Sequence, residues 1–353
     1  MARKSDLIDL RMLPPAEVFF GLSPLMATAR LKLERVANTT IPVLLQGESG
    51  TGKEVFAKLL HIHSNRANSS WVKVNCPAIP NSLIESELFG YEKGAFTGAY
   101  STKQGRVELA HMGTMFLDEV GSLDMTVQAK LLQLLQDGSF TRVGGQEARS
   151  VDTRIISASR GSLQQQTSEG SFRLDFFFRI NAVTIELPSL RQRMEDLPKL
   201  IEYFFDVHSK AFRSTPKPLS RETVRLMQRY DWPGNIRQLE NMIRSYILIG
   251  DEEILALEMV PAASSRLTTE IDLSNPVSLK EITRSATQDL ERQIIMKVLQ
   301  ANGWSRLKTA KWLNISYRSL LYKLQDPQVG ALPGRVKPKE KSVKTQKRTR
   351  SPR

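Results

Sequence analysis

Apolar runs and helical patterns alternate along residues 18–254 of the 353-residue chain. The apolar runs predict strands at residues 42–45, 72–75, 114–117, 154–157 and 183–187. Strands that alternate with helices are typical of a parallel sheet covered by helices. We therefore expect an α/β domain at residues 16–187, preceded by a short irregular lead-in at residues 1–15 that ends in two prolines.

The pattern becomes helical after Pro188, with predicted helices at residues 197–212, 221–230 and 236–249. These predict a helical subdomain at residues 188–255, packed on the sheet domain. A stretch rich in Ser, Thr and Pro predicts a linker at residues 256–282. Three further helices, at residues 290–301, 306–313 and 317–324, predict a small all-α domain at residues 283–326.

The net charge of +13 comes mostly from the C-terminal end. Residues 335–353 hold nine Lys or Arg and one acid, so the rest of the chain is close to balanced. Residues 327–353 have too little apolar content to fold and predict a disordered tail. Such a tail either binds phosphates without reading sequence or stays solvated, and the sequence favours neither.

Composition favours a cytoplasmic protein without membrane contact. No apolar run approaches the roughly 20 residues of a membrane span, and no signal peptide is visible at the N-terminus. The single cysteine, Cys76, has no partner for an internal disulfide, and the four histidines show no metal-binding spacing. His61 and His63 lie two apart on a predicted helix and therefore cannot share a face, which favours structural roles.

A glycine-rich segment between a predicted strand and a predicted helix indicates a phosphate-binding loop. Glycines let backbone N–H groups turn toward phosphates, and the helix N-terminus adds a positive dipole. Lys53 is placed to reach the β- and γ-phosphates of ATP. The general pattern has Ser or Thr after this lysine, where this chain has Glu54. The segment consists of Gly47, Glu48, Ser49, Gly50, Thr51, Gly52, Lys53 and Glu54.

Two acids, Asp118 and Glu119, follow the predicted strand at residues 114–117. Acids at a strand end are often only helix caps, but together with a phosphate loop they predict ATP hydrolysis. Asp118 is placed to hold Mg²⁺, directly or through water, and Glu119 to polarise the attacking water. The expected cofactors are ATP and Mg²⁺.

Several further segments are similar to one family, the sigma-54-dependent transcription activators or bacterial enhancer-binding proteins. The similarity covers about residues 17–325 and implies an AAA+ P-loop ATPase with a parallel sheet and a helical lid, followed by a Fis-like helix-turn-helix domain. In that family a glutamate at the position of Glu54 is usual. The segments are Glu-Leu-Phe-Gly at 87–90, Gly-Ala-Phe-Thr-Gly-Ala at 94–99, Gly-Thr-Met-Phe-Leu-Asp-Glu at 113–119, Phe-Arg at 172–173 and 178–179, and Trp-Pro-Gly-Asn-Ile-Arg at 232–237.

The resemblance implies roles for residues outside the phosphate loop. Arg173 and Arg179 resemble fingers that reach a neighbouring subunit's γ-phosphate, with surface salt bridges as the alternative. Arg237 resembles the sensor arginine of the lid, and Asn75 the asparagine that holds the catalytic glutamate in an inactive pose. In place of the family's Thr-Asn pair that senses the γ-phosphate, this chain has Ser159 and Arg160.

The loop at residues 94–99 is flexible by composition and carries one aromatic ring and one hydroxyl, a combination found in many surface turns. The resemblance implies that it contacts sigma-54, with Phe96 and Thr97 touching the partner. The complete set is Gly94, Ala95, Phe96, Thr97, Gly98 and Ala99.

The last two predicted helices resemble a helix-turn-helix, with a plain three-helix bundle as the alternative. Asn314 suits a left-handed turn and Ser316 suits a helix N-cap. Trp304 stands where the family often has Gly, and Thr309 where it often has Ala. The residues expected to contact DNA are Ser316, Tyr317, Arg318, Ser319 and Lys323.

The sequence therefore predicts an activator that binds double-stranded DNA upstream of a promoter, assembles into a ring, expected to be a hexamer, and uses ATP to remodel the sigma-54 RNA polymerase holoenzyme. About 16 residues precede the ATPase domain, which leaves no room for a receiver domain and predicts control by a separate regulatory protein. Members of that kind include phage-shock regulators and type III secretion regulators, and the latter are slightly favoured. The rival interpretations are an ATP-binding DNA repressor and a general AAA+ unfoldase. The sequence does not decide whether the ring contains one chain type or two.

Overall fold

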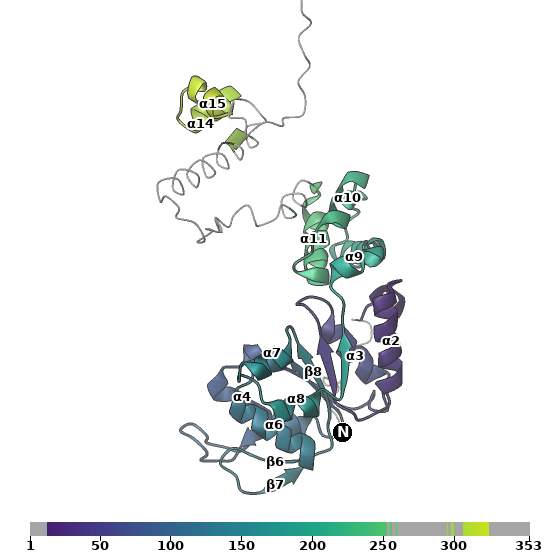
Figure 1. The fold of residues 1–353 in the computed structure, drawn as a ribbon, viewed down its shortest axis with the longest axis vertical. Helices are drawn as coiled ribbons and strands as arrows, with labels where there is room; N and C mark the ends of the chain where they lie inside the picture. The colour runs from purple at the N-terminus through teal and green to yellow at the C-terminus, as the bar shows by residue number, and fades with distance from the viewer. Residues whose placement is uncertain are drawn as a thin grey trace, which may run out of the picture. The chain divides into compact units, whose positions relative to one another are not determined.

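The computed structural model describes residues 13–252, 255, 259, 295, 298, 299 and 306–324, with the backbone alone for residues 321–324. The chain divides into two units, residues 1–261 and 262–353, and each is considered by itself (Figure 1). Most of the predicted lead-in, linker and helix at 290–301 lies outside the described residues, as do the predicted tail and Trp304.

A five-stranded parallel sheet forms the centre of the first unit (Figure 1). All the strands expected from the apolar runs are confirmed, with ends shifted by one or two residues. The order β2-β5-β8-β1-β9 places β8 between β1 and β5, so the carboxyl ends of these three strands are neighbours. The strands are β1 (Val43–Gln46), β2 (Trp71–Asn75), β5 (Thr114–Asp118), β8 (Arg154–Ser159) and β9 (Val183–Glu186).

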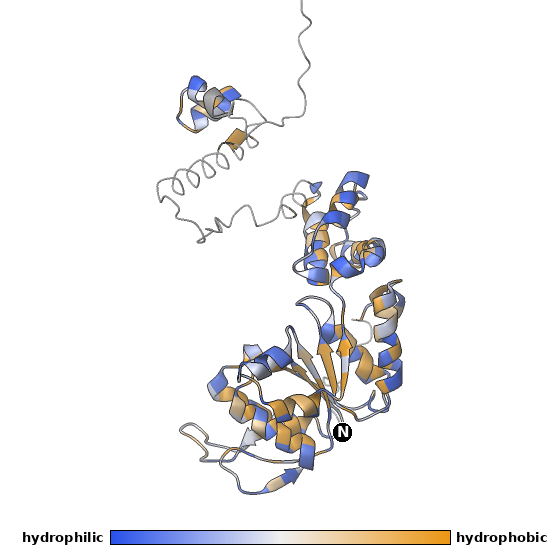
Figure 2. Cartoon of the chain, in the orientation of Figure 1, coloured by the Kyte–Doolittle hydropathy of each residue, from blue (hydrophilic) through white to orange (hydrophobic). Residues whose placement is uncertain are grey.

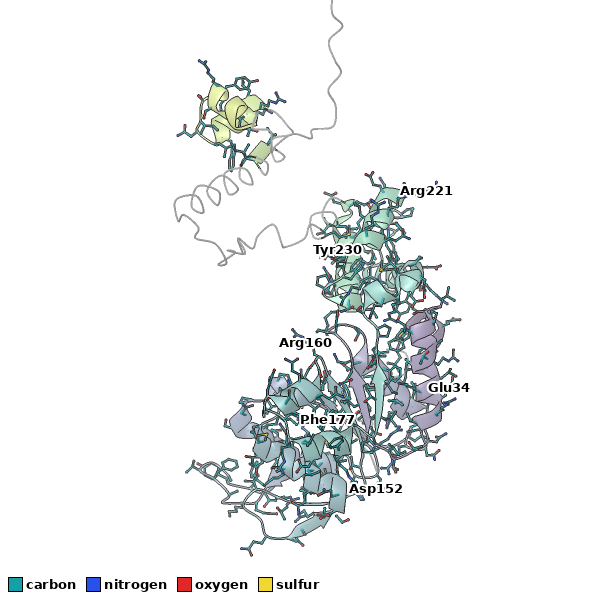
Figure 3. The ribbon with its side chains drawn as sticks, in the orientation of Figure 1. Glu34, Asp152, Arg160, Phe177, Arg221 and Tyr230 are labelled. Carbon is teal, nitrogen blue, oxygen red and sulfur yellow. The ribbon has the colours of Figure 1, made fainter. Side chains whose placement is uncertain are left out.

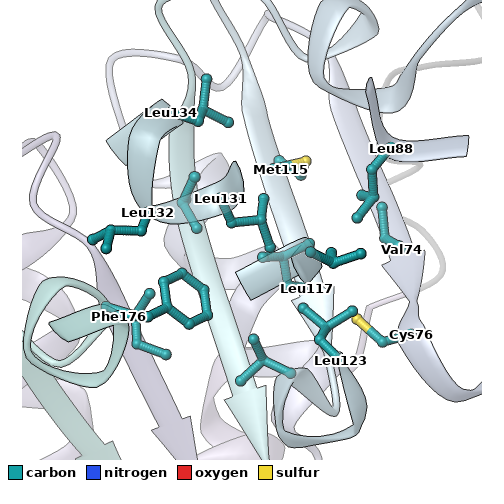
Figure 4. Close-up of a cluster of buried hydrophobic side chains, with 14 of the residues drawn as sticks. Val74, Cys76, Leu88, Met115, Leu117, Leu123, Leu131, Leu132, Leu134 and Phe176 are labelled. Atoms are coloured by element: carbon teal, nitrogen blue, oxygen red, sulfur yellow. The ribbon is translucent and has the colours of Figure 1, made fainter. Parts of the chain in front are cut away.

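Successive strand residues point to opposite faces of the sheet, and each face carries its own core. Leu44, Met115 and Leu117 belong to one cluster, and Figure 4 labels Met115 and Leu117 among its members. Val43 and Phe116 belong to the other. Figure 2 shows apolar residues concentrated in the strands and in the helices that contact them.

Helices cover both faces of the sheet (Figure 1). The helices on the face of Val43 and Phe116 are α2 (Pro24–Val36) and α3 (Lys53–Ile62), with α1 (Ala16–Phe19) before them. The other face is covered by α4 (Asn81–Phe89), α5 (Arg106–Leu109), α6 (Met125–Asp137), α7 (Leu163–Ser168) and α8 (Leu174–Ile180). Short 3₁₀ turns follow β2, β5 and β9: η3 (Cys76–Ala78), η4 (Val120–Ser122), η5 (Leu190–Gln192) and η6 (Met194–Asp196).

The thiol of Cys76 and the ring of His61 are both buried inside this unit. Burial, reinforced by the charge of Asp118, raises the pKa of the Cys76 thiol to about 12. Burial, reinforced by the charge of Arg154, lowers the pKa of His61 to about 4, and its Nδ1 lies 2.9 Å from the Thr114 hydroxyl. Both groups are therefore neutral at physiological pH, which agrees with the structural role expected for His61.

Two antiparallel hairpins, which the apolar pattern did not predict, project from the sheet domain. One pairs β3 (Gly90–Tyr91) with β4 (Lys103–Gln104), and the other pairs β6 (Ser139–Thr141) with β7 (Ala148–Ser150). The buried side chain of Arg142 joins them. Its guanidinium donates to both carboxylate oxygens of Glu108, at 2.8 and 2.7 Å, and to Glu92 at 3.0 Å.

The helical subdomain consists of α9 (Leu197–Phe212), α10 (Arg221–Arg229) and α11 (Asn235–Ile249), which confirms the three predicted helices. Its core contains Trp232, which is fully buried and donates its indole N–H to the Met227 carbonyl at 2.8 Å. Among the described residues, no helix combines the length and apolar character needed to cross a membrane.

In the second unit, α14 (Arg306–Trp312) and α15 (Tyr317–Leu324) form the helix pair that the sequence predicted. Asn314 has the expected left-handed φ of 53°. The Ser316 hydroxyl accepts the Ser319 N–H at 3.0 Å, which confirms the N-cap. Leu320 and Ala310 are buried against Ile295.

We predict that Asp124→Ala lowers the free energy of unfolding by about 1 kcal/mol. The Asp124 carboxylate caps α6 by accepting the N–H groups of Thr126 and Val127 at 3.0 and 2.9 Å. Asp124→Asn keeps an acceptor and is expected to retain most of this stability. Chemical denaturation of the three proteins measures the difference, and equal losses in both variants would contradict the capping role.

Candidate functional site

A cavity of about 960 Å³ opens at the carboxyl edge of the sheet, between the strand ends and α11. Figure 3 shows the side chains of this region, with Arg160 labelled beyond the end of β8. Its lining includes Ser49, Gly50, Gly52, Lys53, Glu54, Asn75, Asp118, Glu119, Ser159, Arg160 and Arg237.

The predicted phosphate loop runs from the end of β1 to the start of α3. Gly52 is the N-cap of α3 with a φ of 99°, and the Thr51 hydroxyl donates to the Glu48 carbonyl at 2.9 Å. The loop therefore presents a helix N-terminus to the cavity, the arrangement that binds phosphate groups.

The Lys53 ammonium lies inside the loop. It donates to the carbonyls of Gly47 at 2.7 Å and Glu48 at 3.2 Å and lies 3.6 Å from a carboxylate oxygen of Glu119. Burial lowers the pKa of Lys53, while the charges of Glu119 and Asp118 oppose that shift. The ammonium is thus a partly desolvated cation, whose attraction to an anion is stronger than it would be in water.

Asp118 ends β5 and Glu119 follows it, and both line the cavity wall, as the sequence predicted. Burial raises the pKa of Asp118 above its ordinary value, with Lys73 opposing and Glu119 reinforcing the shift. Glu119 has a left-handed φ of 57°, and its second carboxylate oxygen accepts the backbone N–H of Arg160 at 3.0 Å. Both acids therefore lie within reach of a phosphate held by the loop.

Glu54, which replaces the usual hydroxyl residue, contacts two lysines. Its carboxylate lies 2.6 Å from the Lys73 ammonium and 2.9 Å from that of Lys58. Although burial acts to raise it, these two hydrogen bonds hold the pKa of Glu54 below its ordinary value. These lysines neutralise the negative charge of Glu54. Asp118 is therefore the better placed carboxylate for a metal ion.

The start of α11 is joined to the phosphate loop by direct hydrogen bonds. The buried Asn235 amide donates to Glu48 at 3.1 Å and to the Ser49 carbonyl at 2.9 Å. The backbone N–H of Ile236 donates to the Gly50 carbonyl at 3.0 Å. Arg237 reaches the Ser49 hydroxyl at 3.3 Å, which places the expected sensor arginine at the cavity.

Asn75 ends β2 directly opposite Asp118 in the strand register and lines the cavity. Within the described part of the chain it forms no hydrogen bond with Glu119, whose carboxylate contacts Lys53 and the Arg160 amide. The role implied by the family resemblance stays a prediction.

Arg173 and Arg179 do not line the cavity of their own chain. Arg173 is the N-cap residue of α8 and pairs with Asp175 at 2.7 Å. The exposed Arg179 donates to the Leu135 carbonyl at 2.7 and 3.1 Å. Their location on the outer side of the domain leaves the predicted role toward a neighbouring subunit open.

The loop at residues 94–99 forms the tip of the β3–β4 hairpin. The Gly94 N–H donates to the Ala99 carbonyl at 2.9 Å and closes the loop. Phe96 is 42% exposed and its ring packs on Tyr91 at 4.9 Å between centroids, while Thr97 is exposed. Ala95 is half-buried and Ala99 is buried. The exposed side chains of the loop are therefore those of Phe96 and Thr97, the two predicted to touch a partner.

In the second unit, the predicted DNA-contacting residues lie at the start of α15. Ser316, Tyr317 and Arg318 are exposed, and Ser319 is half-buried. Lys323 lies in the same helix, where the structure describes the backbone alone.

Sequence reasoning missed two arginines that hold the phosphate loop in place. Arg193 is fully buried and donates to the carbonyls of Phe19 at 3.2 Å and Thr51 at 3.4 Å. Arg191 forms an ion pair with Glu48 of the phosphate loop. A glutamate inside the loop sequence signals the need for a cation, but nothing in the sequence identifies Arg191 as its partner.

We predict that Gly50→Ala destabilises the protein more than Gly94→Ala. Both glycines have a positive φ, 79° and 86° respectively, so both variants lose about 1–2 kcal/mol of backbone preference. A methyl group at residue 50 also meets the Gly234 carbonyl at 2.3 Å, whereas one at residue 94 meets nothing within 4 Å. The clash adds about 1–3 kcal/mol. Thermal unfolding compares the variants, and equal losses would contradict the close contact between the loop and α11.

Three family models match consecutive parts of the chain. A sigma-54 interaction domain matches residues 19–186, an AAA+ ATPase lid domain residues 191–273, and a bacterial regulatory protein of the Fis family residues 287–326. The order and positions of these matches agree with the sheet domain, the three lid helices and the helix pair described above.

Curated relatives resemble the chain along most of its length. The regulatory protein AtoC of Escherichia coli is 40% identical over 86% of this chain and 66% of its own length. The Nif-specific regulatory protein of Rhodobacter capsulatus is 38% identical over 86% of this chain and 59% of its own. The transcriptional regulatory protein ZraR of Salmonella typhimurium is 38% identical over 86% and 67%. The chain thus spans about two thirds or less of these relatives.

Solved structures give the same result. NtrX from Brucella abortus is 32% identical, with a TM-score of 0.63 over 88% of this chain and 69% of that chain. NtrX has also been solved in complex with ADP and with ATP, each with a TM-score of 0.64 to this chain. From its domain order, its fold and these relatives, the chain belongs to the sigma-54-dependent transcriptional activators.

Proposed function

We propose that this chain is an ATP-dependent transcriptional activator. It binds DNA upstream of a promoter and uses ATP hydrolysis to remodel RNA polymerase bound to sigma-54, so that the promoter opens. The observation that carries this proposal is that the sigma-54 interaction domain, residues 19–186, contains both the phosphate loop that lines the cavity and the exposed loop at 94–99.

ATP fits the cavity by its charge and geometry. The loop supplies backbone N–H groups and Lys53 for the phosphates, and the related NtrX is known with ADP and with ATP. In the hydrolysis that we propose, water attacks the γ-phosphorus, Glu119 accepts its proton, and ADP leaves with the bridging oxygen. The left-handed backbone of Glu119 and the N–H of Arg160 aim that carboxylate into the cavity.

The residues present also fit a magnesium ion. Mg²⁺ is usually held by one or two carboxylates together with phosphate oxygens and water. Asp118 offers such a carboxylate at the cavity wall, whereas Glu54 is committed to Lys58 and Lys73. Bound there, the ion would neutralise charge on the β- and γ-phosphates.

Hydrolysis in a ring, which we expect to be a hexamer, explains the position of two arginines. Arg173 and Arg179 lie outside the cavity of their own chain, where a neighbouring subunit's cavity can receive them. A fixed guanidinium stabilises the charge that develops on the transferred phosphoryl group. The hexameric number, the separate regulatory protein and the cytoplasmic location stay predictions.

A short chain path connects the cavity to the loop at 94–99. Asn75 and Pro77 line the cavity, and the chain continues through η3 and α4 directly into β3 of the hairpin. A change at the phosphate end of the cavity can therefore move the loop. This supports sigma-54 contact through Phe96 and Thr97, whose side chains the loop exposes.

DNA binding is supported by the helix-turn-helix geometry of α14 and α15 and by the Fis-family match. In such a pair the first residues of the second helix read the major groove, where Tyr317 and Arg318 are exposed. The alternative function, an ATP-binding DNA repressor that does not act on sigma-54, leaves the exposed loop at 94–99 without a purpose.

We predict that Thr97→Ala abolishes transcription while ATP hydrolysis and DNA binding remain near the wild-type level. Ser101→Ala is the matched control, because it removes an exposed hydroxyl from the same hairpin. Promoter-reporter assays, ATPase assays and footprinting measure the three properties. Transcription that survives Thr97→Ala, or that survives deletion of sigma-54, would show that the repressor interpretation is the better one.

We predict that Lys53→Ala weakens ATP binding by roughly 10- to 100-fold, the usual size of a hydrogen bond to a charged group. Glu119→Gln should keep ATP binding but slow hydrolysis by about 10²- to 10⁴-fold. Lys210→Ala, which removes an exposed lysine of α9 that does not line the cavity, is the control and should change either value little. Nucleotide titration and steady-state kinetics test this, and hydrolysis by the Glu119→Gln protein at the wild-type rate would refute the assignment.

A further inference from the structure

Arg160 occupies an unusual place at the cavity wall. It follows Ser159, the last residue of β8, and Ser159 pairs in register with Gln46 at the end of β1. The Ser159 carbonyl accepts the N–H of Gly47, the first residue of the phosphate loop, at 3.3 Å. Arg160 therefore begins next to the place where the phosphate loop begins.

Arg160 also adjoins the acid expected to activate water. Its backbone N–H lies 3.0 Å from the Glu119 carboxylate, which in turn lies 3.6 Å from the Lys53 ammonium. A long side chain that starts at this point is within reach of whatever phosphate Lys53 holds.

The guanidinium of Arg160 is uncommitted. The other cations of this region are engaged: Lys53 with Glu119, Lys58 with Glu54, and Arg237 with the Ser49 hydroxyl. Among the residues that the structure describes, the exposed Arg160 side chain has neither a hydrogen bond nor an ion pair. A planar guanidinium without a partner, at the wall of a phosphate cavity, suits an oxyanion.

We propose that Arg160 is a catalytic arginine supplied in cis, whose guanidinium binds the γ-phosphate of ATP held by its own chain. This inference rests on the proposed ATP hydrolysis. As water attacks and the bond to the bridging oxygen breaks, negative charge spreads over the γ-phosphate oxygens, and Arg160 stabilises that charge.

The variant Arg160→Gln tests the proposal because it removes the charge, keeps a long polar side chain and preserves the backbone N–H that contacts Glu119. We expect kcat to fall about 10- to 100-fold, less than the 10³–10⁵ that an arginine finger can supply, because Arg173 and Arg179 remain. Affinity for ADP, which lacks the γ-phosphate, should stay within about twofold. Arg160→Lys should retain an intermediate rate.

The matched control is Arg229→Gln, which removes an exposed arginine at the end of α10, among residues that do not line the cavity. It should leave kcat and ADP affinity unchanged. A wild-type kcat in the Arg160→Gln protein would overturn the proposal, and so would an equal loss of ATP and ADP affinity, which indicates a structural role.

Mixed assemblies separate action in cis from action in trans. Arg160→Gln subunits mixed with Glu119→Gln subunits should recover no activity, because neither chain then has a complete site of its own. In contrast, the double variant Arg173→Ala, Arg179→Ala mixed with Glu119→Gln should recover activity, since the neighbour supplies the fingers. Recovery in the first mixture would show that Arg160 acts on the adjacent subunit and would overturn the proposal.

Two measurements distinguish this inference from the function on which it rests. If the wild-type protein fails to hydrolyse ATP, or if Glu119→Gln hydrolyses it normally, the proposed function itself fails. If the wild type is active, Glu119→Gln is inactive and Arg160→Gln is normal, only the role of Arg160 fails.

Discussion

The contact between the phosphate loop and the first turn of α11 is the constraint on which the rest of the first unit depends. The Asn235 side chain uses its amide nitrogen on Glu48 and Ser49 and its oxygen on the Leu190 N–H, at 2.7 Å. One buried side chain thus joins the loop, the turn after the sheet and the lid. A buried amide left without such partners costs about 1–3 kcal/mol, so the three parts are held together as one arrangement.

The contacts of the Lys53 ammonium in the cavity are ones that a bound anion can replace. The Lys53 ammonium donates to two backbone carbonyls and pairs with Glu119. A phosphate group is a stronger partner for an ammonium than these groups are. Binding of a polyanion therefore exchanges internal contacts for stronger ones and frees Glu119 from Lys53. The acid then keeps the Arg160 amide as its hydrogen-bond donor.

The sequence was sufficient for the sheet and the lid because their apolar residues follow regular periods. The runs around Leu44 and Phe116 and the helices around Leu200 and Met242 bury nearly complete side chains, so burial decides their structure. The two hairpins escaped because their strands contain two or three residues each and carry exposed polar side chains such as Lys103. A strand of two or three residues is too short for the alternation of apolar and polar side chains to be recognised in the sequence.

The candidate site was predictable where chemistry lies close together in sequence, as in the loop around Lys53 and the pair Asp118 and Glu119. Contacts that join distant segments were not, because residue type alone does not identify a partner. Arg193 meets Thr51 across 142 residues, and Asn235 meets Ser49 across 186. Likewise, only the three-dimensional structure shows that the guanidinium of Arg160 has no partner among the described residues.

The single buried thiol has a practical consequence. With a pKa near 12 and 2% exposure, Cys76 stays protonated and out of reach of thiol reagents that attack surface cysteines at neutral pH. A cysteine introduced at an exposed position such as Tyr100, which is 87% exposed, would then be the one reactive thiol of the chain. The movement proposed for the loop at residues 94–99 can therefore be followed by a fluorescent or spin label in the otherwise natural protein, without a cysteine-free background.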